Sequence, residues 1–117
     1  MHQLAVKNFS KPDQTVNLSG HGHKDTVMLD GMAVEFSEFE KGWRWSNDVK
    51  PIVGGESCQA NHLGYCVEGH LKVHMNDGTD KDIKAGDVFE IPPGHDAEVI
   101  GDHKVVLVDF GKAVAAM

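Results

Sequence analysis

Histidines stand at both ends of the stretch from residue 62 to residue 95, which carries the strongest chemical signal in the chain. Imidazole is the commonest metal ligand and titrates near neutral pH, so a histidine aimed into a cavity can bind a metal or move a proton. His62 and His95 are separated by short strand-like runs and by turns at residues 77–78, 85–87 and 92–94. Strands that fold back at this spacing can close into a small barrel with alternate side chains directed inward.

The rest of the chain also reads as strand after strand. Alternating apolar and polar residues, or short apolar runs between turn residues, predict strands over residues 26–29, 32–37, 71–75, 88–91, 97–100 and 105–110. No segment combines sustained helical periodicity with capping residues, so we expect no helix. Residues 50–59 contain Pro51, Gly54 and Gly55 and read as a loop. This organisation indicates an all-β sandwich or barrel.

Length and composition allow one domain with one core, because the chain has 117 residues and 40% hydrophobic content. We divide it into an N-terminal arm or edge segment, residues 1–20, and a single barrel domain, residues 21–117. The formal charge of −7 argues against nucleic acid and anionic membranes as partners. No apolar run approaches the roughly 20 residues of a membrane span. Two cysteines are too few for a disulfide framework, and we expect thiols in a reducing cytoplasm.

Two motifs resemble those of the cupin superfamily, whose members are small β-barrels of the jelly-roll type. The second cupin motif is a glycine, five spacers, a proline, one spacer and a glycine, and this chain has that spacing from Gly86 through Pro92 to Gly94. The first motif ends in a glycine, which matches Gly69 in the segment 65–69. The resemblance covers roughly residues 32–110. It implies a small single-domain cupin barrel, also called a double-stranded β-helix.

The positions at which many cupins hold a metal depart from the family pattern in this chain. That pattern is two histidines spaced by one residue, a glutamate, and a third histidine three residues after the second-motif glycine. Counting back from Gly69 places His62 at the glutamate position. The same register places Glu56 and Cys58 at the histidine pair.

The third-histidine position is also altered. Ala97 occupies it, but His95 lies two residues earlier, and on a strand both side chains point the same way. A second register, counted from Gly42, puts Asp48 at a ligand position and makes the loop before His62 an insertion.

The resemblance therefore implies a mononuclear metal site of Cys58, His62 and His95, with Glu56 or Asp48 as a fourth group. Imidazole suits Zn, Fe, Ni or Cu, and a thiolate shifts the preference, so we expect a divalent transition metal with Zn favoured over Fe, Ni or Cu. A coordinating cysteine argues against dioxygenase chemistry at iron. The alternative is structural: Cys58 is a small buried residue and His62 a hydrogen-bonded interior histidine.

We expect Trp43, Trp45 and Tyr65 to line a ligand pocket, because barrel mouths bind small molecules with aromatic walls and a few polar groups. The two indoles fit barrel core or a dimer face equally well. Two classes of function follow for a small polar ligand. The first is a non-catalytic binding module, and the second is a metal-dependent enzyme of isomerase or oxygenase type. We also expect a homodimer, because of the polar N-terminal arm and because open sheet edges are usually covered by another element or another chain.

Overall fold

The structure is a computed structural model, and it describes residues 3–110. In this part of the chain the elements are almost all strands, joined by short turns. Their bounds are β1 Gln14–Asn17, β2 Gly22–Leu29, β3 Met32–Phe39, α1 Trp45–Asp48, α2 Lys50–Val53, β4 His62–Glu68, β5 His70–Met75, β6 Asp80–Lys84, β7 Val88–Ile91, β8 His95–Val99 and β9 Val105–Asp109. Within residues 3–110, neither helix is long or apolar enough to cross a membrane.

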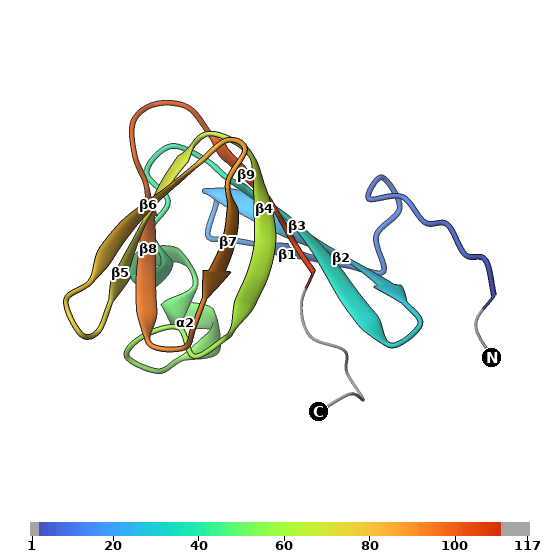
Figure 1. Cartoon of the computed structure of the whole chain (residues 1–117), viewed down its shortest axis with the longest axis horizontal. Helices are drawn as coiled ribbons and strands as arrows, with labels where there is room; N and C mark the ends of the chain where they lie inside the picture. Colours follow the sequence, from blue (N-terminus) through green and yellow to red (C-terminus); the bar gives the residue numbers. More distant parts are fainter. Residues whose placement is uncertain (1–2, 111–117) are drawn as a thin grey trace.

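Two antiparallel sheets face each other and enclose the core, so the all-β expectation is confirmed. The larger sheet has the order β1-β2-β3-β9-β4-β7 and the smaller one β6-β5-β8. Figure 1 shows the smaller sheet standing opposite β4 and β7, with α2 beneath the gap between them. One side of each sheet is buried in between, which explains the alternation of buried and exposed residues along β4 and β8.

The segment expected to be an arm or edge, residues 1–20, is partly built into the larger sheet. Residues 14–17 form the edge strand β1, which pairs antiparallel with β2. Leu18 follows directly and belongs to the buried core. Residues 3–13 run away from the barrel (Figure 1), and the ring of Phe9 lies tilted against the ring of Phe36, with centroids 5.3 Å apart.

Two single-turn helices occur where we expected none, so that prediction was wrong. Helix α1 begins after Arg44, whose backbone N–H donates to the Asp48 carboxylate at 2.9 Å. The second carboxylate oxygen of Asp48 lies 2.8 Å from His21 Nδ1. Pro51 occupies the first turn of α2, where its missing N–H costs nothing. Helices of four residues are too short to leave a periodic pattern in the sequence.

Gly69 and Gly86 both adopt the positive φ expected at reversals of the chain, but their surroundings differ. Gly69 has φ +89°, and a Cβ there would lie 2.3 Å from the carbonyl oxygen of Lys104. Gly86 has φ +95°, and a Cβ there would meet nothing within 4 Å. The backbone conformation therefore restricts both positions, whereas close approach of the β9 entry restricts only Gly69.

We predict that Gly69→Ala destabilises the protein more than Gly86→Ala. Both variants force a residue with a Cβ into the left-handed region, at about 1–2 kcal/mol. Gly69→Ala also displaces the backbone near Lys104, which adds about 1–3 kcal/mol. Urea unfolding of the two variants and the wild type measures the difference. Equal free energies of unfolding for the two variants would contradict this account.

Candidate metal centre and cavity

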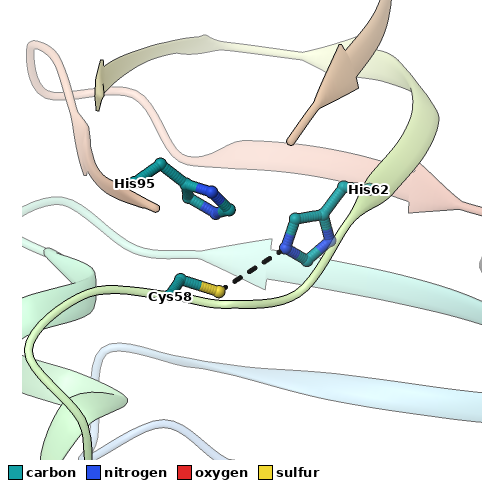
Figure 2. A group of neighbouring side chains, drawn as sticks. All are labelled: Cys58, His62 and His95. Carbon is teal, nitrogen blue, oxygen red and sulfur yellow. Dashed lines mark hydrogen bonds between the residues drawn. The ribbon is translucent and has the colours of Figure 1, made fainter. Parts of the chain in front are cut away.

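The structure brings Cys58, His62 and His95 together from two separate parts of the chain. His62 begins β4 in the larger sheet, His95 begins β8 in the smaller one, and Cys58 lies in the loop before β4. One ligand atom from each lies within 4.8 Å of the others. Figure 2 shows the two imidazoles and the thiol turned toward a common point.

Backbone hydrogen bonds hold the Cys58 loop against the start of β8. The N–H of Cys58 donates to the His95 carbonyl at 2.7 Å, and the N–H of Gly94 donates to the Cys58 carbonyl at 2.7 Å. The same residues form an isolated antiparallel bridge. The turn at residues 92–94 thus aims His95 inward and also fixes the thiol beside it.

His95 is 3% exposed, and one of its ring nitrogens has a partner that determines the tautomer. Nδ1 lies 2.8 Å from the carbonyl oxygen of Pro92, which can only accept, so Nδ1 carries the proton. The Nε2 lone pair is then available to a metal. Ligating histidines are commonly oriented in this way by a hydrogen bond from their other nitrogen.

His62 is held by a carboxylate that sequence reasoning missed. Its Nδ1 lies 2.5 Å from Asp109 Oδ2, and its Nε2 lies 3.7 Å from Cys58 Sγ (Figure 2). Asp109 ends β9, which pairs directly with β4, and it is buried. The available signal was a carboxylate inside the apolar run 105–110. Such a residue is expensive to bury without a partner.

These contacts set the charges of the thiol and the imidazole. Burial alone would raise the pKa of the Cys58 thiol, but the adjacent imidazoles of His62 and His95 outweigh it and lower that pKa to about 6. Burial alone would lower the pKa of His62, but the Asp109 carboxylate and the Cys58 sulfur raise it to about 9. Near neutral pH the site without metal holds a thiolate beside an imidazolium.

Neither residue considered as a fourth ligand belongs to this group in the described part of the chain. Glu56 is exposed on the loop before Cys58. Asp48 is buried, but its carboxylate is engaged at the start of α1 and by His21. Ala97 lies on the same inward face of β8 as His95, and both are buried, as the alternation along a strand predicts.

A cavity of about 640 Å³ adjoins the three donor residues. Trp43 and Trp45 are both buried in its wall. Trp43 stacks on Phe39 with ring centroids 3.9 Å apart. Tyr65 was expected in this wall but is not among the described residues that line the cavity. Its side chain lies on the outer face of β4 and is 41% exposed, because β4 turns alternate residues outward.

The polar residues of the smaller sheet form a separate network on its outer side. Arg44 pairs with Asp96 and Glu98, both at 3.1 Å. Both ring nitrogens of His74 face carboxylates, at 2.9 Å from Asp80 and 2.5 Å from Glu98. Hydrogen bonds to Glu98 and Asp80 raise the pKa of His74. These charges stabilise the outer surface and do not contribute to the cavity.

No protein-family model matches the sequence, and no curated protein matches it. Solved structures do match. An RmlC-like cupin from Shewanella frigidimarina superposes with a TM-score of 0.60 at 21% identity, over 96% of each chain. Oxalate decarboxylase from Lactobacillus farciminis gives 0.61 at 20% identity, over 86% of this chain. A sugar phosphate isomerase of the cupin superfamily from Silicibacter pomeroyi gives 0.59 at 16% identity, over 81% of this chain.

The chain spans 31% of the oxalate decarboxylase and 61% of the isomerase. Likeness at these identities establishes the fold, and it agrees with the paired sheets and the glycine turns described above. The chain therefore has the cupin fold, a double-stranded β-helix.

Proposed function

We propose that this protein binds a divalent transition metal, with Zn²⁺ favoured over Fe, Ni or Cu, and holds a small molecule in the adjoining cavity. One observation carries the proposal. Three donor atoms lie within 4.8 Å of one another, and Nδ1 of both imidazoles is engaged elsewhere, so Nε2 is the nitrogen left for a metal, which in His62 displaces the proton shared with Cys58. One thiolate and two imidazoles are a donor set that suits Zn²⁺.

The number of donors supports a role beyond structural stabilisation. Structural zinc sites have four protein ligands, whereas sites that act on other molecules have three and leave one position for water or a ligand. When bound, the metal would supply a Lewis acid beside the cavity. The chain itself contributes the orientation of His62 by Asp109 and an apolar wall that limits access of water.

The alternative is a metal-dependent enzyme of isomerase or oxygenase type. The same three-donor arrangement favours it, and solved structures of this fold include an oxalate decarboxylase and a sugar phosphate isomerase. A His62→Ala variant separates the two roles. A binding module has no turnover to lose, whereas an enzyme loses turnover together with the metal.

Co²⁺ titration of metal-free protein tests the metal centre. We expect one equivalent to bind with a thiolate-to-metal charge-transfer band in the near ultraviolet, because Cys58 is a ligand. Cys58→Ser should abolish this band. The matched variant Cys66→Ser should keep it, because Cys66 is buried on β4 outside the donor group. Failure to take up Co²⁺ or Zn²⁺, or a band that survives Cys58→Ser, would overturn the site.

Asp109→Asn tests the orientation of His62. The variant loses a carboxylate that orients a metal ligand, so we expect Zn²⁺ affinity to fall about 10–100-fold near pH 9, where proton competition is weak. Near pH 7 the loss should be smaller. Removing the carboxylate lowers the pKa of His62 from about 9, and fewer protons then compete with the metal.

Competition with a chromophoric chelator at several pH values measures both affinities. In the wild type the affinity should rise about tenfold per pH unit between the pKa values of Cys58 and His62, because metal binding displaces one proton. The same affinity in variant and wild type at every pH would refute this role of Asp109.

We infer that the protein is a homodimer in which the outer face of β4 and β7 is covered by a second copy. Apolar side chains gather there although the face is exposed: Leu63, Tyr65, Val67 and Val88. Tyr65 and Val88 are direct cross-strand partners, and β7 is an edge strand. Exposed apolar patches beside an open sheet edge mark association surfaces.

We propose the cytoplasm as the location of this protein. The two cysteines, Cys58 and Cys66, are free thiols, which fits a reducing compartment.

Light scattering at micromolar concentration tests this association. We expect twice the 12.8 kDa chain mass for the wild type, and the chain mass for Tyr65→Asp/Val88→Asp, because buried unpaired charges oppose the interface. The matched variant Val53→Asp, also at an exposed valine, should remain a dimer. A monomeric wild type would end the proposal.

A further inference from the structure

The cavity lining is chemically divided between the metal donors and the remaining wall. The three donor atoms are gathered within 4.8 Å, so they occupy one part of the lining. Most of the remaining wall is apolar, with the aromatic rings of Phe39, Trp43, Trp45 and Phe89 among its residues. A ligand rich in hydroxyls would leave many of them unpaired against this wall, and each unpaired hydroxyl costs free energy.

The cations of the described chain are placed where they do not favour a phosphate in the cavity. Lys24 is the one lysine or arginine among the described lining residues, and its Nζ is paired with Glu35 at 3.4 Å. Arg44 lies on the outer side of the smaller sheet and is paired twice. Phosphate recognition usually needs arginine forks or clustered lysines, so the lining selects against a sugar phosphate.

The rim of the cavity is apolar as well. Ile52 and Val53 of α2 line the cavity and are also 53% and 65% exposed. When a ligand with an apolar body covers exposed apolar side chains at a cavity entrance, their surface is removed from water and the binding free energy becomes more favourable. This observation is independent of the wall composition, and it points to the same kind of occupant.

The charge of the metal centre determines which polar group the ligand carries. A divalent metal with one thiolate and two neutral imidazoles carries a net charge of +1, and one monoanionic oxygen ligand neutralises it. The buried Asp109 carboxylate behind His62 adds a further negative charge, so with it a bound carboxylate leaves one excess negative charge in the site and a phosphate dianion leaves two. The polar group that fits is a single carboxylate.

We propose that the cavity binds a small monocarboxylate with an aromatic or branched aliphatic body. Its carboxylate occupies the open position of the metal, and its body lies against Trp43, Trp45 and Phe39. The inference rests on the proposed metal site and adds the class of ligand to it.

Calorimetry on the Zn²⁺-loaded full chain tests the ligand class with three probes. Hydrocinnamate has the carboxylate and an aromatic body, propanoate has the carboxylate with almost no body, and glycerol phosphate is of similar size but polar. We expect hydrocinnamate to bind at least tenfold more tightly than either of the others, because burying a phenyl group contributes most of the affinity.

A rim variant provides the matched control. Val53→Asp should weaken hydrocinnamate binding at least tenfold and leave Co²⁺ affinity unchanged, because Val53 lines the entrance and is not a donor. Val6→Asp, at another exposed valine far along the arm, should change neither.

The outcomes separate this inference from the metal site. A loaded protein that binds propanoate or glycerol phosphate as tightly as hydrocinnamate overturns the ligand class and leaves the metal site intact. Equal affinity of hydrocinnamate for metal-free and loaded protein overturns the carboxylate–metal contact. Failure to load any metal overturns both the proposed function and this inference.

Discussion

The candidate site exists because the two sheets pack face to face. His62 belongs to the larger sheet, whereas His95 belongs to the smaller one, and no hydrogen-bonded ladder connects β4 with β8. Burial of the apolar inner faces is the interaction that holds these sheets together. Cys58 is bonded through its backbone to His95 and so moves with the smaller sheet. Any change in the spacing of the sheets changes the distance between donors.

Local hydrogen bonds then refine what the packing brings together. Asp109 and the carbonyl of Pro92 each accept a hydrogen bond from Nδ1 of one imidazole, which leaves Nε2 directed to the cavity. Neither bond depends on a metal being bound, so the orientation of both rings is built into the protein. Preorganisation of this kind lowers the entropy that binding must overcome.

Sequence patterns were sufficient for much of the fold. Alternation along residues 32–37 and 71–75 identified β3 and β5, and the glycine–proline motif from Gly86 to Gly94 identified the turns around β7. Strand β6 gave no such signal, because Ile83 is its one buried apolar residue. The helices were missed because a single turn leaves no periodicity, and the bond from the Arg44 N–H to the buried Asp48 carboxylate at the end of α1 is not visible as a pattern.

The sequence by itself determined the period of each strand, the reversals at Gly69 and Gly86, and the presence of a thiol and histidines near the motif positions. These depend on neighbouring residues, through backbone conformation and side-chain alternation. Only the tertiary structure decided that Asp109 supports His62, that Asp48 is engaged elsewhere and that Tyr65 faces outward. Such roles depend on strand register and sheet packing, which join residues far apart in the chain.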